Sequence, residues 1–208
     1  MTASVGNVQA AAPDPLKSAL WPLDCVGSYY FYAEMSAGWM RTGINAANTT
    51  IGHRSTRNPD FHPTTSSSAK GKIRYRAASQ NSCDGSFTWT ACADAYSDFT
   101  WRLWLSSEKC WTDGSNNTCS SGTKYDVQTV ALNEMGHINR LSHHLPTTRH
   151  DDNPDYDDAV VQLIPDPVGS THPFGVNQAI RWADHAALYS RYGPDPCTTP
   201  PCPLGVDS

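Results

Sequence analysis

The sequence has few charged residues, no long hydrophobic run and no cluster of basic residues. Charged side chains make up 17% of its 208 residues, against roughly 25% in typical soluble domains. No apolar stretch is long enough to span a bilayer. The net charge of -5 and the scattered basic residues, which form no run or stripe, argue against nucleic acid as a partner. We therefore expect a rigid, polar, secreted domain that binds neither membranes nor nucleic acid, and the sequence leaves its oligomeric state open.

A CxxC pair is also missing, although the chain has seven cysteines. Structural zinc sites commonly use such pairs, so a structural zinc site is not expected. Seven cysteines are many for a cytosolic protein of this size and indicate an oxidising, extracellular location. The spacing favours three local disulfides and leaves Cys25 either unpaired or joined to the C-terminal tail. The three pairs are Cys83 with Cys92, Cys110 with Cys119, and Cys197 with Cys202.

The hydrophobic patterns predict an α+β domain with its strands early and two helices late. Residues 1–18 are expected to be disordered and residues 196–208 to form a tail with a local disulfide, so the folded domain covers residues 19–195. The expected strands are 27–32, 72–76 and 100–105, and the expected helices are 40–51, 125–138 and 177–192. Polar residues, Gly and Pro predict loops at 57–72, 110–123 and 142–158.

Aromatic residues gather at positions 29–32 and again at Trp101 and Trp104. Both groups lie in predicted strands, where large aromatic side chains contribute strongly to a core. We therefore expect this aromatic cluster to belong to the core and not to form a carbohydrate-binding platform.

Residues 133–144 contain the strongest functional pattern, Asn-Glu-Met-Gly-His-Ile-Asn-Arg-Leu-Ser-His-His. On the predicted helix, Asn133 and His137 lie one turn apart on the same face, so both can bind one ion. Glu134 beside them can hold a water molecule, and His143 can supply a third ligand if the chain turns back after His137. Three ligands leave one position open for water, the ion lowers the pKa of that water, and the carboxylate removes its proton.

This pattern resembles the metzincin metallopeptidases, and among them the matrixin-like ones, whose motif is His-Glu-x-x-His-x-x-Gly-x-x-His. Glu134, His137 and His143 match this motif by position and type. Further along the chain, residues 158–162 stand where the family has its Met-turn, and residues 183–189 resemble its C-terminal helix.

The resemblance implies a zincin fold, with a twisted mixed sheet packed on the active-site helix and a C-terminal helical subdomain. It also implies a secreted zinc endopeptidase that cleaves polypeptides. Glu134 would be general base and then proton donor, and Asn133, His137 and His143 would hold zinc or another divalent metal. The alternative is an inactive relative, a pseudoenzyme without metal, that keeps the cleft and binds a polypeptide through its sheet edge.

Three residues depart from the family's pattern. Asn133 replaces the first His, and because an amide oxygen is a weaker zinc ligand than imidazole, a weakened site is expected. Arg140 replaces the glycine of the turn, where left-handed backbone is unfavourable for Arg, and Asn139 is the alternative residue for that conformation. Val161 replaces the Met of the Met-turn, which is a milder change in the packing beneath the ion.

Overall fold

The computed structural model describes residues 26–52, 58–83, 85–96 and 100–141, together with Leu188, Tyr189, Tyr192 and Gly193. Of the helix expected at 177–192, Leu188, Tyr189 and Tyr192 have helical backbone, and Gly193 follows with a positive φ of 75°. The expectations that lie outside the described residues concern the segment 1–18, the tail 196–208 with Cys197 and Cys202, the pairing of Cys25, the ligand His143, and the residues 158–162 and 183–187.

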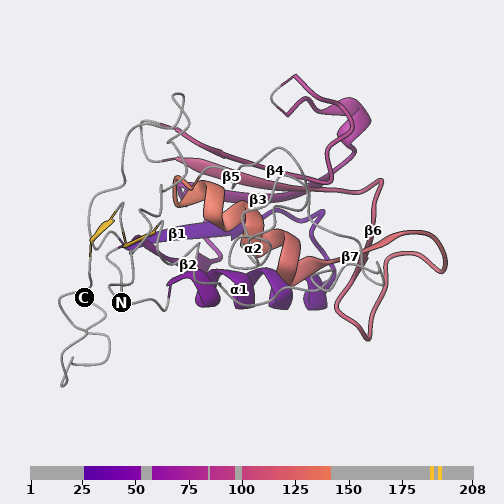
Figure 1. Cartoon of the computed structure of the whole chain (residues 1–208), viewed down its shortest axis with the longest axis horizontal. Helices are drawn as coiled ribbons and strands as arrows, with labels where there is room; N and C mark the ends of the chain where they lie inside the picture. Colours follow the sequence, from indigo (N-terminus) through magenta and orange to yellow (C-terminus); the bar gives the residue numbers. More distant parts are fainter. Residues whose placement is uncertain are drawn as a thin grey trace, which may run out of the picture.

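The described residues form a mixed five-stranded sheet, a two-stranded sheet, two α-helices and a short 3-10 helix, Ala78–Gln80 (Figure 1). The larger sheet has the strand order β2-β1-β3-β5-β4, and every neighbouring pair is parallel except β4 with β5. The strands of this sheet are β1 (Val26–Phe31), β2 (Asp60–Thr64), β3 (Gly71–Arg76), β4 (Ala91–Ala95) and β5 (Trp101–Ser106). The smaller sheet pairs β6 (Cys110–Thr112) with β7 (Lys124–Asp126) in parallel. The expected α+β class is confirmed.

Strands β1, β3 and β5 lie where the sequence predicts them, whereas β2, β4, β6 and β7 do not. β7 occupies the first residues of the helix expected at 125–138, and that helix begins at Val127. β2 falls inside the expected loop 57–72 and β6 inside the expected loop 110–123, so both loop predictions are wrong in part. β2 and β4 are the two outer strands of the larger sheet. An outer strand pairs on one side only and therefore tolerates Pro63 in β2, which lacks a backbone donor.

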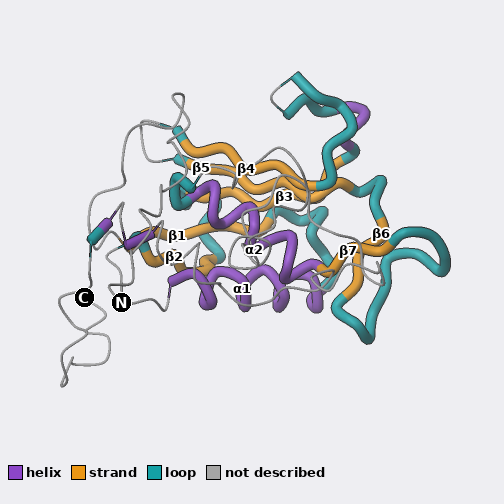
Figure 2. Tube along the Cα trace, viewed as in Figure 1, coloured by secondary structure: helices purple, strands orange, loops and turns teal. Residues whose placement is uncertain are grey.

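Helices α1 (Gly38–Gly52) and α2 (Val127–Ile138) pack against each other and run together along the sheet (Figure 2). Gly43 allows this close packing, because a Cβ at its position would lie 2.5 Å from Cγ1 of Val127. Asp126 is the N-cap of α2. Its carboxylate accepts hydrogen bonds of 2.7 Å from both the backbone N–H and the hydroxyl of Thr129, which satisfies a donor that the first helical turn leaves unpaired.

The main core lies between the larger sheet and the two helices. Because side chains alternate along a strand, every second residue of the inner strands points toward this core, and most of those residues are almost completely buried. They include Tyr29, Ile73, Trp101 and Leu103. On the helix side, α1 contributes Met40, Ile44, Ala47 and Ile51, whose spacing of three and four residues is that of the buried face of an amphipathic helix.

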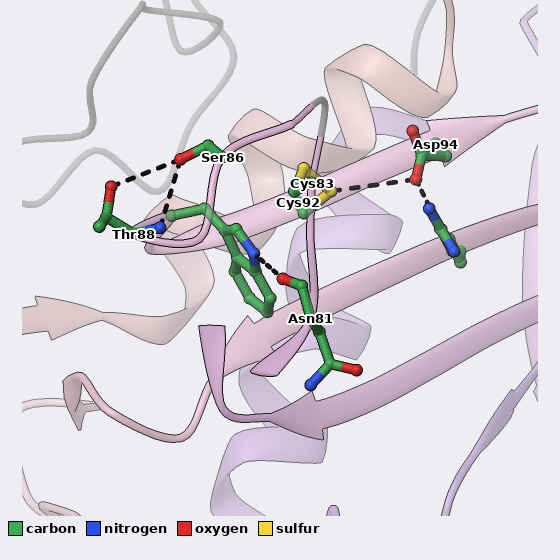
Figure 3. The surroundings of a disulfide bond; sticks show 8 residues. Asn81, Cys83, Ser86, Thr88, Cys92 and Asp94 are labelled. Carbon is green, nitrogen blue, oxygen red and sulfur yellow. Dashed lines mark hydrogen bonds and ion pairs between the residues drawn. A yellow bond between two sulfur atoms is a disulfide. The ribbon is translucent and has the colours of Figure 1, made fainter. Parts of the chain in front are cut away.

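Two disulfides are present among the described cysteines, and both confirm the pairs expected from spacing: Cys83 with Cys92 and Cys110 with Cys119. The first closes the excursion between β3 and β4 (Figure 3). Inside it, the indole N–H of Trp89 donates a 2.7 Å hydrogen bond to the carbonyl oxygen of Asn81. Within the described part of the chain, no helix is long and apolar enough to cross a membrane.

Candidate metal site on helix α2

Helix α2 is buried nearly all the way round, and this makes its polar residues informative. Ten of its twelve residues are buried. Among them, Asn133 is 2% exposed and Glu134 is 8% exposed. Burial of an amide and a carboxyl side by side costs free energy unless both have partners, and both residues do interact with other groups. A polar pair at the centre of a buried helix therefore points to a role beyond packing.

The helix brings three of the predicted site residues to one side. His137 follows Asn133 by four residues and Glu134 by three, and both spacings place side chains next to each other on a helix surface. His137 lies in the last turn of α2 and is partly exposed, whereas the other two are buried. The site therefore runs from the buried interior at Asn133 and Glu134 toward the surface at His137.

The chain turns back directly after His137, through a Schellman motif at the end of the helix. The backbone N–H of Leu141 donates to the carbonyl oxygen of Gly136 at 2.9 Å, and the N–H of Arg140 donates to that of His137, also at 2.9 Å. These two hydrogen bonds satisfy carbonyls that the end of the helix leaves unpaired. A turn, which the predicted approach of His143 requires, is thus present as far as Leu141.

The same turn orients the imidazole of His137. Its Nδ1 lies 2.9 Å from the carbonyl oxygen of Leu141, a distance that corresponds to a hydrogen bond donated by Nδ1–H. A backbone carbonyl on one ring nitrogen sets the tautomer and makes the other nitrogen, Nε2, the atom suited to a metal. His137 is therefore held in the manner of a metal-ligating histidine.

Arg140 takes the left-handed conformation at the turn, with φ of 66°, and Asn139 has φ of -76°. The alternative of a left-handed Asn139 is therefore wrong. The guanidinium of Arg140 explains the outcome, because it donates hydrogen bonds to the carbonyl oxygens of Ala95, at 2.7 Å, and Tyr96, at 3.0 Å. These contacts join the turn to the end of β4 and offset the cost of a Cβ in left-handed backbone.

Asn139 fixes the turn from the other side. Its side-chain amide donates to the carbonyl oxygen of Met135 at 2.9 Å and accepts a 3.3 Å hydrogen bond from Asn58. Its backbone carbonyl accepts a 2.9 Å hydrogen bond from the hydroxyl of Tyr192. Sequence reasoning missed Asn58 and Tyr192 as supports of the site, because no local pattern links residues so far apart in the chain.

The third predicted ligand, His143, lies outside the described residues. Among the residues that are described, no group of three His, Cys, Asp or Glu side chains is placed to hold a metal ion. The structure thus brings Asn133, Glu134 and His137 together, and the three-ligand site with His143 stays a prediction.

The chain matches no protein-family model, and no curated protein matches it. Any assignment to a family therefore depends on the residues and the geometry of this chain.

Proposed function

We propose that the protein is a secreted, metal-dependent endopeptidase of the metzincin type, matrixin-like, with a weakened metal site. The single observation that supports this most is the end of α2. The helix stops just after His137, reverses at Arg140, where the family's motif has glycine, and holds the ring of His137 by its Nδ1. The two disulfides and the lack of a membrane-spanning helix in the described residues fit a secreted protein.

The proposed ligands are Nε2 of His137, an imidazole nitrogen of His143 and the amide oxygen of Asn133. Two imidazoles suit zinc, and one amide oxygen in place of a third imidazole lowers the affinity without removing the site. When bound, the metal polarises the scissile carbonyl and makes a water molecule more acidic.

Glu134 is the proposed general base. It accepts a proton from the water that attacks the scissile carbonyl carbon, so that a C–O bond forms. It then delivers that proton to the amide nitrogen as the C–N bond breaks, and the products are a carboxylate and an amine. The position of Glu134 on the same side of α2 as His137 suits a group that must reach both the water and the leaving nitrogen.

The polypeptide substrate would lie along β4. This strand is at the outer edge of the larger sheet and contacts α2, so an extended segment added to that edge would pass close to His137. Arg140 bonds to Ala95 and Tyr96 at the end of β4 and thereby fixes the distance between the edge and the proposed metal ligands.

The second candidate function is the binding of a polypeptide at the same sheet edge, without catalysis. In an inactive relative, β4 would still add a polypeptide strand, while Asn133 would leave the metal site too weak to work. The position of β4 at the edge of the sheet, next to α2, supports this candidate as well as the first.

Cleavage of an unfolded protein, such as reduced casein, separates the two candidates. The parent is compared with Glu134→Gln, which keeps the size of the side chain, and with Glu134→Ala, each supplied with zinc, cobalt or copper in excess. We expect slow, chelator-sensitive cleavage by the parent and none by either variant. Equal residual cleavage by all three proteins would point to a contaminant and favour the binding module.

A further inference from the structure

The face of the larger sheet that points away from α1 and α2 carries alternating cationic and aromatic side chains. In one row across the strands, Tyr30 pairs with Lys72 and Lys72 with Arg102; in the next row, Arg74 pairs with Trp104. These residues alternate with core residues along each strand, so they lie on the opposite face. We call this surface the cationic face and define it by Tyr30, Tyr32, Lys70, Lys72, Arg74, Arg102 and Trp104.

This face corrects two expectations from the sequence. Tyr29 and Trp101 belong to the main core, as expected, but Tyr30 and Tyr32 are partly exposed on the cationic face. Trp104 is buried as expected, but in a second, smaller core cluster with Trp89. The basic residues, scattered in sequence, are brought together because β3 places one on this face at every second position, a repeat of roughly 6.6 Å.

The aromatic rings support the cations on this face. The guanidinium of Arg74 lies 4.0 Å from the ring centroid of Tyr32, and that of Arg102 lies 4.1 Å from the ring centroid of Trp104. Lys72 lies 5.9 Å from the ring centroid of Tyr30. Cation–π contacts of this kind restrict the side chains and present planar guanidinium groups at fixed places.

A depression of about 460 Å³ lies in the cationic face. Four cationic residues line it, Lys70, Lys72, Arg74 and Arg102, and no Asp or Glu belongs to its lining. The whole chain has a net charge of -5, so this concave surface opposes the overall charge. Such a local concentration of positive charge attracts anions.

Two carboxylates border the cationic face and position its guanidinium groups. Glu34 accepts a 2.7 Å hydrogen bond from Nε of Arg74, and Asp94 accepts one of 2.5 Å from Nε of Arg102. Asp94 lies beside Cys92 on β4 (Figure 3). Partial burial raises the pKa of Glu34, but the hydrogen bond from Arg74 and the nearby positive charges outweigh it and hold that pKa below its ordinary value. Both carboxylates contact Nε of the guanidinium, and Arg74 and Arg102 both line the depression.

We propose that the cationic face binds an acidic polysaccharide, one that carries sulfate or carboxylate groups along its chain. Planar guanidinium groups match such oxyanions in a bidentate geometry, and the lysines add point charges between them. The depression holds a short stretch of such a chain, and the cations on neighbouring strands contact its repeated anionic groups.

The geometry disfavours the other polyanions. Single-stranded nucleic acid is bound by stacking its bases on aromatic faces, but here Arg74 lies over Tyr32 and Arg102 over Trp104. An acidic polypeptide commonly gains its affinity by adding a strand to a sheet edge. Lys72, Arg74 and Arg102 lie on β3 and β5, which are inner strands paired on both sides, and Lys70 directly precedes β3.

The test measures heparin binding by the whole chain with isothermal titration calorimetry at low ionic strength, in the presence of a chelator. The chelator makes the result independent of the proposed metal site. The double variant Lys70→Gln/Lys72→Gln is compared with the matched control Lys109→Gln/Lys124→Gln, which removes the same charge near β6 and β7. Neutral dextran, oligothymidylate and polyglutamate serve as competing ligand classes.

We expect heparin to bind the parent and the control equally, and the Lys70/Lys72 variant to bind roughly three- to tenfold more weakly with a shallower salt dependence. Neutral dextran should not bind. The proposal is overturned if the parent does not bind heparin, or if both double variants lose affinity equally. Tighter binding of oligothymidylate or of polyglutamate than of heparin would overturn it too, and would assign the face to that polymer.

Discussion

Arg140 is the residue at which the turn after α2 can be tested most directly. Its backbone is left-handed, with φ of 66°, and its side chain, in a residue only 3% exposed, bonds to Ala95 and Tyr96. A hydrogen bond from a charged donor contributes about 1.5–3 kcal/mol. Loss of both bonds in Arg140→Ala should therefore lower the free energy of unfolding by roughly 3 kcal/mol or more.

Arg140→Gly loses the same bonds but also removes the Cβ from a left-handed residue. That removal stabilises the folded state by about 1 kcal/mol. We therefore expect a loss of about 2 kcal/mol for the glycine variant. Arg140→Lys keeps the charge and can bond to only one of the two carbonyls at a time, so its stability should fall between the parent and the alanine variant.

Equilibrium unfolding in urea, with the disulfides intact, measures these differences. At a slope near 2 kcal/mol per molar urea, the glycine variant should unfold at a midpoint roughly 1 M below that of the parent, with an unchanged slope. The expected order of stability is parent, then glycine, then alanine. A glycine variant at least as stable as the parent would refute the stabilising contribution of the guanidinium. An alanine variant as stable as the glycine variant would refute the energetic cost of a Cβ in left-handed backbone at this position.

Three further predictions concern the metal site, the start of α2 and a disulfide. Asn133→His should raise the affinity for zinc by about tenfold or more, since imidazole replaces a weak amide ligand. Competition against a chromogenic chelator measures the affinity, and an unchanged value would mean that Asn133 is not what weakens the site. Asp126→Ala should lower the free energy of unfolding by about 1–2 kcal/mol, because the hydrogen bonds that cap Thr129 are lost. Urea unfolding measures this, and an unchanged free energy of unfolding would contradict the role of Asp126 as the cap. Replacing Cys83 and Cys92 with Ser should cost about 2–3 kcal/mol, from the closed loop of this length, and a thermal midpoint equal to the parent's would disprove it.

The sequence predicted those parts of the fold in which hydrophobic residues recur with a clear period or aromatic residues are frequent. Helix α1 shows its buried face at Met40, Ile44, Ala47 and Ile51, and β1, β3 and β5 lie within a residue of their expected bounds. β2 and β4 escaped prediction because outer strands depend on pairing with a neighbour more than on their own composition. Neither the Pro in β2 nor the alanines in β4 favour a strand.

The candidate site was predictable along one helix and not beyond it. The spacing of Asn133, Glu134 and His137 follows from helix geometry alone. The supports of the turn come from distant segments, with Ala95 bonded to Arg140 and Tyr192 bonded to Asn139, and contacts of that kind have no local sequence signal. For the same reason, the gathering of scattered cations into one face became visible only with the strand register.

Anomalous scattering at the zinc absorption edge, from crystals of the parent protein grown with zinc, tests the proposed metal site most directly. We expect one peak beside Nε2 of His137, with His143 and the amide oxygen of Asn133 as the other protein ligands. Crystals that bind zinc elsewhere but show no peak at His137, or that hold His143 too far from His137 for one ion to bridge, would contradict it.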